Sequence, residues 1–495
     1  MNIRIVVSYV PRYRRGHEWD FVPPVTGIHL AALSGPQHAI DVVHEQVRVP
    51  RVDTWPDLVA ISFFSGFADR AYALADAYRS IGVAVVLGGP HVSYWVDEAL
   101  AHADAVVVGE AESVWQQVLA DFEPEAADRP APASDAPAPV VAAAARRPAR
   151  RGARVYRGTA RSLAGLPTPR YDLLEPRFLV PRVLQATRGC PFSCAFCSVP
   201  DLNPGFRVRP VEDVVRDIAA TSFRGYFQDR VVWFWDDNLL VQRRWAKTLL
   251  GELRGLNKWW LTQASIDIVR DTELLDAMER SGCIGIFLGI ESVDAEALKS
   301  VDKRQNRIAE YRDAVARLHG RGICVMAGFI SGFDTQTPEA IVNVAEQLDA
   351  LEFDVPFLSI LTPFRGTPLY DELLRDGRIL RDRGWAHYNG YNVAFRPKRM
   401  SPEALLAAHR RLWRRAFAPT AVAARIARGA RQLRPGAALL SASMNGFYGL
   451  KRLTGNLPAD ALPAAHHEDE ASRLPISHPE PSSPPERLTQ VGRSA

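Results

Sequence analysis

Three closely spaced cysteines carry the strongest chemical signal in the sequence. Cys190, Cys194 and Cys197 lie in the segment RGCPFSCAFC, which begins at Arg188. Thiolates at such spacing are the usual ligands of iron–sulfur clusters. A structural metal site such as zinc is the alternative, but it needs a fourth ligand, and no Cys or His follows Cys197 within the next thirty residues. Three thiolates leave one iron of a four-iron cluster open for chemistry, so we expect a catalytic [4Fe-4S] cluster.

The elements around these cysteines alternate between strand and helix. Short runs rich in β-branched residues predict strands at 183–186, 231–235, 260–265, 285–290, 325–330 and 357–361. Apolar periodicity predicts helices between them, for example at 211–221, 242–255 and 338–351. Six such units fit a parallel (β/α)6-type barrel, in which catalytic residues follow the carboxyl ends of the strands. The cysteines directly follow the first of these strands.

Together, these features resemble the radical S-adenosylmethionine (SAM) enzymes. The family has an aromatic residue before its last cluster cysteine, and Phe196 occupies that place. The resemblance implies that the open iron binds the amino and carboxylate groups of SAM. It also implies that one electron, supplied by an external donor of the flavodoxin or ferredoxin type, cleaves SAM to a 5′-deoxyadenosyl radical.

Segments at the predicted strand ends extend this resemblance. WDDN, ending at Asn238, occupies the place of the segment that binds the SAM amino group, and Asp236 or Asp237 suits an ammonium partner. A helix N-cap at Asp237 or Asn238 is the alternative. The resemblance also assigns SAM contacts to Phe196, Glu291, Ser292, Gly328 and Gly332. Gln263 and Ser265 join this set because they end the third predicted strand and would face the same barrel mouth. Cys283 and Cys324 lie in apolar strands, so we expect both to be buried free thiols.

Residues 1–122 show a separate strand–helix alternation. Strands are predicted at 3–7, 58–64, 83–87 and 105–108, with a helix at 69–81, which indicates a Rossmann-like parallel sheet covered by helices. Small residues follow the strands, where open α/β sheets bind ligands. No GxGxxG motif is present, so a dinucleotide is not favoured.

A domain of this kind ahead of a radical SAM barrel resembles the cobalamin-binding subfamily. The resemblance assigns the cofactor contacts to Ser62, Ser65, Gly66, Gly88, Gly89, His91, Gly109 and Glu110. The DxHxxG signature, whose His ligates cobalt, is absent, so we expect cobalamin to be held without a protein His ligand. The alternatives are a tight turn at Gly88–Gly89, a helix cap by His91 and a solvated loop acid at Glu110.

The remaining segments set the domain limits. Between residues 124 and 149 Ala and Pro dominate, and such a segment reads as a linker. The predicted division is 1–122 cobalamin-binding domain, 123–155 linker, 156–380 radical SAM barrel, 381–455 helical basic region and 456–495 disordered tail. The segment from Trp385 to Pro402 resembles a C-terminal extension in a branch that includes hopanoid-modifying enzymes.

The C-terminal region is strongly basic. Residues 404–459 contain ten Lys or Arg and no Asp or Glu, with Leu, Trp and Phe interleaved at helical spacing. One interpretation is a solvated helical face packed on the barrel. Another is adsorption to anionic lipid, which would place a cytoplasmic protein at the inner face of the membrane. A nucleic-acid partner is disfavoured, because no recognition fold accompanies the charge.

Composition agrees with a folded enzyme. The 495 residues are 47% hydrophobic and 23% charged, with a net charge of +4, no run long enough to span a membrane and too few cysteines for a disulfide framework.

The resemblance implies that one SAM methylates cobalt and that a second generates the radical. The activity would then be methylation of an unactivated carbon of a small-molecule or lipid substrate, such as a hopanoid. Ring formation or rearrangement without methyl transfer, and a non-catalytic iron–sulfur sensor, are the rival hypotheses.

Overall fold

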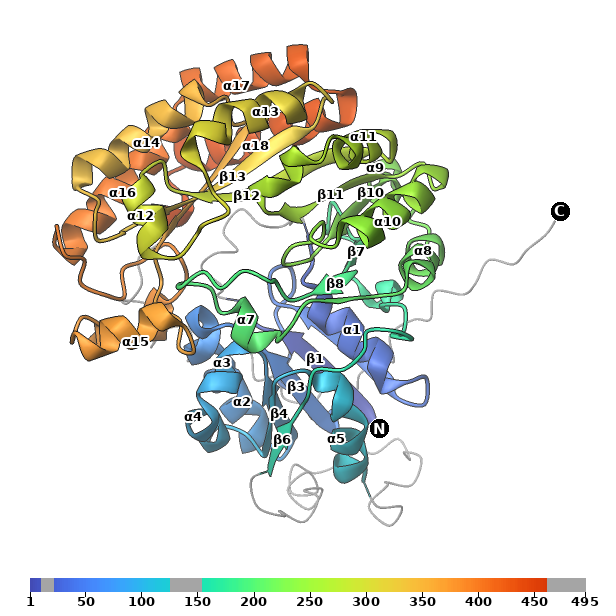
Figure 1. Ribbon diagram of the computed structural model, residues 1–495. Coiled ribbons are helices and arrows are strands. Elements are labelled where there is room, and N and C mark those ends of the chain that lie inside the picture. Colours follow the sequence, from blue (N-terminus) through green and yellow to red (C-terminus); the bar gives the residue numbers. More distant parts are fainter. Residues whose placement is uncertain (10–21, 125–153, 461–495) are drawn as a thin grey trace.

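The computed structural model describes residues 1–9, 22–124 and 154–460, and it contains two parallel sheets with helices around them (Figure 1). Most of the predicted linker and of the predicted tail lies outside the described residues. Figure 1 shows the first sheet with α1–α5 in the lower part of the view and the second sheet with most of the later helices above it, while α15 lies beside α3. The predicted combination of a Rossmann-like domain, a partial barrel and a helical C-terminal region is confirmed.

The first sheet is parallel throughout and has the order β2-β1-β3-β4-β5-β6 within the described residues. Its strands are β1 (Asn2–Val7), β2 (Ala39–His44), β3 (Leu58–Ser62), β4 (Ala84–Gly88), β5 (Ala105–Val108) and β6 (Arg154–Arg157). The helices are α1 (Val25–Ser34), α2 (Ala68–Ser80), α3 (Pro90–Tyr94), α4 (Val96–Ala101) and α5 (Trp115–Phe122). The inner strands are apolar because helices bury both of their faces.

One domain limit differs from the prediction. β6 pairs in parallel with β5, which places residues 154–157 in the first sheet. The predicted linker ends at 155 and the predicted barrel begins at 156, so both limits cut through this strand. The cause is the composition of β6, whose sequence RVYR is that of a polar edge strand rather than of a buried one.

The second sheet is also parallel, with the order β14-β13-β12-β11-β10-β7 among the described residues. Its strands are β7 (Val183–Leu184), β10 (Val231–Phe234), β11 (Trp259–Ala264), β12 (Cys283–Glu291), β13 (Cys324–Ser331) and β14 (Val355–Ile360). The helices between them are α7 (Val199–Leu202), α8 (Val211–Ala219), α9 (Tyr226–Arg230), α10 (Arg243–Gly255), α11 (Thr272–Arg280), α12 (Ala295–Ser300), α13 (Tyr311–His319) and α14 (Pro338–Ala350). Neighbours in sequence are neighbours in the sheet, as a (β/α)6-type barrel requires.

The two faces of the second sheet are buried by different helices. Val325 packs in one core with Leu249 and Leu253 of α10, whereas Met326, its neighbour in β13, packs in another core with Met444. Successive strand residues point to opposite faces, so these are the outer and inner faces of the barrel. Met444 belongs to α18 (Pro435–Leu453), which therefore fills part of the barrel interior.

α18 covers only the lower part of that inner face. Gly285, near the start of β12, lies directly under Leu440 of α18, and Cys324 at the start of β13 belongs to the same core. Inner-face residues nearer the carboxyl ends of the strands, such as Gln263 and Ser359, remain partly exposed. The helix thus forms the floor of the barrel and leaves its mouth open.

The C-terminal region is helical, as predicted. It contains α16 (Pro402–Ala416), α17 (Pro419–Gln432) and α18, and α15 (Pro368–Arg375) precedes it. Hydroxyl N-caps begin two of these helices: Thr367 accepts a hydrogen bond from the Tyr370 amide, and Ser401 accepts one from the Ala404 amide. No helix in the described part of the chain is both long and apolar enough to cross a membrane.

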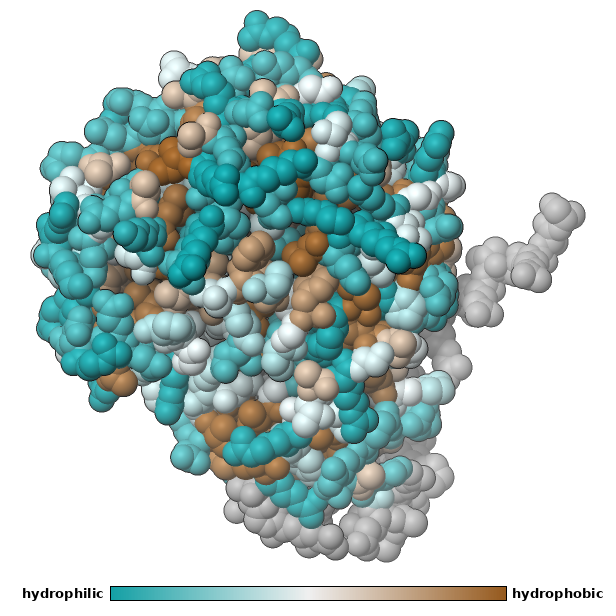
Figure 2. Space-filling model, viewed as in Figure 1, coloured by the Kyte–Doolittle hydropathy of each residue, from teal (hydrophilic) through white to brown (hydrophobic). Residues whose placement is uncertain are grey.

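The basic side chains of this region are largely bound within the protein. Arg415 pairs with Glu346 of α14, and Arg428 donates to the carbonyl oxygen of Phe353. Arg434 donates to the carbonyl oxygens of Glu279 and Cys283. The visible surface in Figure 2 is mainly hydrophilic, with smaller apolar areas between the polar ones. These contacts favour the interpretation in which the basic helices pack on the barrel.

Candidate cluster and cofactor site

The cysteine loop is held at the junction between the two domains. A short antiparallel ribbon, β8 (Thr187–Arg188) paired with β9 (Arg207–Val208), closes the loop at its base, and α7 lies within it (Figure 1). Gly189 has a φ of +89°, and a Cβ there would overlap the carbonyl oxygen of Gly205. The glycine is therefore required for the chain to turn into the loop.

Backbone hydrogen bonds tie the middle of the loop to the barrel. The Ala195 amide donates to the Val301 carbonyl oxygen, and the Leu369 amide donates to the Ala195 carbonyl oxygen, both at 2.9 Å. Cys194 is buried, and Cys190 and Cys197 are partly buried, so the thiols are shielded without being sealed off.

The residues fit an iron–sulfur cluster. Burial raises the pKa of Cys190, and it raises that of Cys197 to about 11, so both thiols need a metal to become thiolates near neutral pH. No set of three His, Cys, Asp or Glu side chains in the described ranges surrounds a single metal ion. A four-iron cluster does not need one, because each thiolate binds a different iron.

Two amide side chains point at the cysteine sulfurs. The Asn238 Nδ2 atom lies 3.7 Å from Cys190 Sγ, and the Gln305 Nε2 atom lies 3.6 Å from Cys194 Sγ. Asn238 also exchanges hydrogen bonds with Ser265, which fixes its orientation. Hydrogen bonds to cluster sulfurs tune the reduction potential, so these amides are candidate tuning residues.

The two acids after β10 shape the base of the cysteine loop. The Asp236 carboxylate is 1% exposed and accepts hydrogen bonds from the backbone amides of Ala186 and Thr187 and from the Thr187 hydroxyl. Burial raises its pKa to about 7, against the effect of these bonds. Asp237 accepts a bond from the Gly189 amide and remains partly exposed, so of the two it is better placed to meet the amino group of SAM.

Glu291 ends β12 and Ser292 directly follows it, as predicted, but both side chains already have partners. The Glu291 carboxylate binds Lys303 Nζ at 2.7 Å and folds over Gly289. Ser292 Oγ accepts a bond from the Asp294 amide at the start of α12. Lys303 lies 5.7 Å from the centre of the Phe196 ring, which brings a cation beside the cysteine loop. No motif or strand end in the sequence marks Lys303 as part of the site.

The two glycines predicted to bind SAM, one within β13 and one directly after it, face different surroundings. Gly328 faces the barrel interior, where a Cβ would lie 2.8 Å from the Phe287 ring. Gly332 has a φ of +108°, and its Cα faces Leu405 of α16. Gly328 therefore lies at the open barrel space, together with the partly exposed Gln263 and Ser265, whereas Gly332 supports the packing of the C-terminal helix.

The carboxyl edge of the first sheet offers backbone and small side chains to a cofactor. Gly88 has room above it, since a Cβ there would come no closer than 3.7 Å to another atom, and at neighbouring strand ends Ser62 is partly exposed and Gly109 is exposed. Gly89, with a φ of +102°, turns the chain against the Phe63 carbonyl oxygen. This surface fits a large flat cofactor, with Gly88 as the open cradle and Gly89 as the turn that forms it.

His91 and its neighbours are part of the domain packing. Its ring is fully buried and hydrogen bonds to Ser65 Oγ at 3.1 Å and to the Tyr72 hydroxyl at 3.0 Å. Gly66 lies against the backbone of Tyr388, in the C-terminal region. His29 and His44, the other described histidines near this edge, bind Glu112 and the Pro24 carbonyl oxygen. Both ring nitrogens of His91 are therefore engaged within the first domain.

Glu110 is not a solvated acid. Its carboxylate accepts hydrogen bonds from Arg188, just before the cysteine loop, and from Arg207. This contact joins the carboxyl edge of the first sheet to the base of the cysteine loop.

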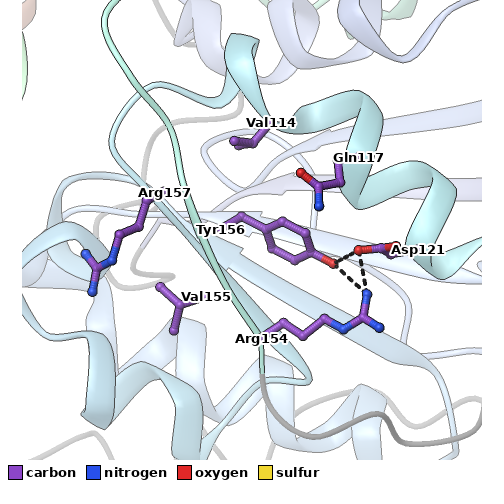
Figure 3. Close-up of a pocket in the computed structure, with 7 residues that line it drawn as sticks. All are labelled: Val114, Gln117, Asp121, Arg154, Val155, Tyr156 and Arg157. Carbon is purple, nitrogen blue, oxygen red and sulfur yellow. Dashed lines mark hydrogen bonds and ion pairs between the residues drawn. The ribbon is translucent and has the colours of Figure 1, made fainter.

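Among the described residues, two cavities lie away from the contact between the first sheet and the cysteine loop. One, of about 400 Å³, opens beside β6 and α5 and is lined by Val114, Gln117, Asp121, Arg154, Val155, Tyr156 and Arg157 (Figure 3). The other, of about 560 Å³, lies between the first domain and α15 and is lined by Trp95, Arg365, Tyr370, Asp371, Leu374, Ile379, Arg381, Gly384, Trp385 and Tyr388. Cys283 and Cys324 are free and fully buried, as predicted.

Comparison with known families agrees with this architecture. Residues 184–348 match the radical SAM superfamily, residues 36–119 match the B12 binding domain, and residues 367–455 match a domain of unknown function, DUF4070.

Individual proteins resemble the chain along most of its length. The bacteriochlorophyllide d C-12(1)-methyltransferase of Chlorobaculum tepidum is 27% identical, over 81% of this chain and 84% of that protein. The hopanoid C-2 methylase of Rhodopseudomonas palustris is 27% identical, over 73% of this chain and 66% of that protein. The structure of the radical SAM methyltransferase TsrM from Kitasatospora setae superposes with a TM-score of 0.58 at 16% identity, over 91% of this chain and 97% of that one. The chain therefore combines a radical SAM domain with a B12-binding domain, the pair of domains expected of a cobalamin-dependent radical SAM enzyme.

Proposed function

We propose that this protein is a cobalamin-dependent radical SAM methyltransferase acting on an unactivated carbon of a small molecule or lipid. The observation that carries the proposal is the contact between Glu110 and Arg188. It joins the sheet edge that would hold cobalamin to the loop that would hold the cluster, so both cofactors would border one space. Methyltransferase relatives support the proposal.

Each part of the site has a separate task in this proposal. Cys190, Cys194 and Cys197 hold the cluster, which supplies the electron for SAM cleavage. Asp237, Gln263 and Gly328 lie where SAM would be bound along the barrel mouth. Gly88 and Gly109 line the edge that would hold cobalamin, which supplies the methyl carrier. The burial of Cys194 and the α18 floor limit access of water to the reacting groups.

The test is anaerobic reconstitution with iron, sulfide and hydroxocobalamin, followed by reaction with SAM and a strong reductant. About four irons and one cobalt per chain are expected, with both 5′-deoxyadenosine and S-adenosylhomocysteine as products. Cys194→Ala should abolish deoxyadenosine. Deoxyadenosine without S-adenosylhomocysteine, even with cobalt bound, would favour ring formation or rearrangement. Intact SAM in the reduced protein would indicate a non-catalytic iron–sulfur protein.

Two partners follow from this proposal. An external one-electron donor of the flavodoxin or ferredoxin type must supply the electron that reduces the cluster, because the proposal includes no other redox group. Contact with an anionic membrane is less favoured, since Arg415, Arg428 and Arg434 are bound within the protein. In a flotation assay at low salt, we expect the protein not to rise with vesicles containing phosphatidylglycerol. Co-flotation that salt abolishes would restore the lipid hypothesis.

A further inference from the structure

Charged side chains from both domains meet beneath the cysteine loop. Glu110 and Glu112 follow β5, Arg188 and Arg207 lie in β8 and β9, and His29 lies in α1. The Arg188 guanidinium binds both carboxylates at 2.8 Å, Arg207 binds Glu110, and His29 binds Glu112 at 3.0 Å. We call these five residues the interdomain charge network.

Burial protects the hydrogen bonds of this network from competing water. The side chain of Glu110 is 8% exposed and that of Arg188 is 10% exposed, so little water competes for their hydrogen bonds. Although burial opposes it, hydrogen bonding to His29 and the charge of Arg188 lower the pKa of Glu112 well below its usual range. Arg188 presents one nitrogen of its planar fork to each carboxylate, a geometry that a Lys cannot reproduce.

The network connects two functional surfaces over a very short length of chain. Arg188 is two residues before Cys190, and Glu110 directly follows Gly109 at the carboxyl edge of the first sheet. Arg188 and Arg207 are also paired as backbone partners in the ribbon that closes the cysteine loop. A movement of the Gly109–Glu112 segment would therefore pull on both strands of that ribbon.

We propose that Glu110 and Glu112 are positioning residues, which fix the cysteine loop relative to the cobalamin edge through Arg188 and Arg207. Their carboxylates are already paired with Arg188, Arg207 and His29. They set the distance and angle between cluster-bound SAM and cobalamin, so transfer of the SAM methyl group depends on them more than reductive cleavage of SAM does. This inference rests on the proposed function for its catalytic consequence, but its structural part does not.

A second contact region keeps the domains together without the network. Trp385 Nε1 donates to Glu98 at 2.7 Å, and Arg365 donates to the Tyr94 carbonyl oxygen at 3.0 Å. Loss of the charge network should therefore loosen the cysteine loop locally and leave the domains associated. Glu98→Gln is the matched control, because it removes an interdomain carboxylate that does not touch the loop.

The first test uses the metal-free protein and amide hydrogen exchange. In Glu110→Gln/Glu112→Gln, the amides of residues 187–197 should exchange about tenfold faster, because charge-assisted hydrogen bonds hold that segment closed. Arg207→Gln, which leaves Arg188 paired, should give a smaller increase and guards against misfolding of the double variant. Glu98→Gln should leave this segment unchanged. Unchanged exchange in both network variants would overturn the proposal.

The second test compares two fates of SAM in the reconstituted protein, with cobalamin and reductant but no substrate. We expect the network variants to keep their iron and their deoxyadenosine production, while the ratio of S-adenosylhomocysteine to deoxyadenosine falls about tenfold. An unchanged ratio despite faster exchange would reduce the network to a structural role and overturn the positioning claim. Wild-type protein that makes no S-adenosylhomocysteine would refute the proposed methyl transfer, and hydrogen exchange would still decide whether the network holds the loop.

Discussion

The reduction potential of the cluster should depend on Gln305. Its Nε2 atom lies 3.6 Å from the Sγ atom of Cys194, within hydrogen-bond distance of sulfur. Reduction adds negative charge to the cluster, so a donor to this thiolate stabilises the reduced form more than the oxidised form. Gln305→Ala should therefore make the cluster harder to reduce.

The size of this effect follows from ordinary hydrogen-bond energies. A neutral hydrogen bond contributes about 0.5–1.5 kcal/mol net, and a one-electron couple shifts by about 59 mV for each tenfold change in equilibrium constant. Since a tenfold change is about 1.4 kcal/mol, the potential should fall by about 20–60 mV. The length of the contact with Cys194 favours the lower half of that range.

The assay is an anaerobic redox titration followed by the electron paramagnetic resonance signal of the reduced cluster. Gln305→Glu keeps the shape of the side chain but brings a negative charge to Cys194, so the potential should fall further than in Gln305→Ala. Arg304→Ala is the matched control, because its side chain is 87% exposed and pairs with Asp302 rather than with sulfur. Potentials unchanged in both Gln305 variants would refute the reasoning, as would an upward shift in Gln305→Ala.

Three further predictions test other parts of the molecule. Cluster assembly should become more favourable as pH rises from 7 to 9, because burial raises the pKa of Cys197 to about 11 and its proton must leave when iron binds. The expected gain is about 1.4 kcal/mol per pH unit for each proton released, and iron retention against a chelator measures it. Gly88→Val should weaken cobalamin binding in an equilibrium absorbance titration, while the melting temperature changes by no more than a few degrees, because a Cβ there meets no protein atom closer than 3.7 Å. Met444→Ala should lower the melting temperature by creating a cavity worth about 2–5 kcal/mol, whereas Leu453→Ala, 70% exposed at the end of the same helix, should have almost no effect.

The buried strands were predictable because their composition reflects their position. Strands such as β4 and β13 lie between two layers of helices and consist almost entirely of apolar residues and glycine. β2 and β6 escaped prediction because they are the edges of the first sheet. Asp41 interrupts β2, and arginines begin and end β6, so neither shows the apolar run of an inner strand.

The site was predictable where function depends on residue type and spacing, and not where it depends on distant partners. The cysteine spacing and the glycines after β4 can be read locally. The bond from Gln305 to Cys194 joins residues 111 positions apart, and nothing in the sequence near Gln305 indicates it. Asp236 was assigned to SAM by its place after β10, but three loop donors surround its carboxylate. Only the fold shows which acids are already paired.

The position of α18 also constrains the order in which the chain can fold during synthesis. β14 ends at Ile360, whereas α18 ends at Leu453. Its floor residues therefore leave the ribosome roughly 5–20 s after the barrel strands that they cover. During this interval the lower inner face, including Met326 and Phe287, has no covering helix. The nascent barrel thus carries an apolar surface that chaperones can recognise, and truncation before α18 should yield an aggregating chain rather than a smaller enzyme.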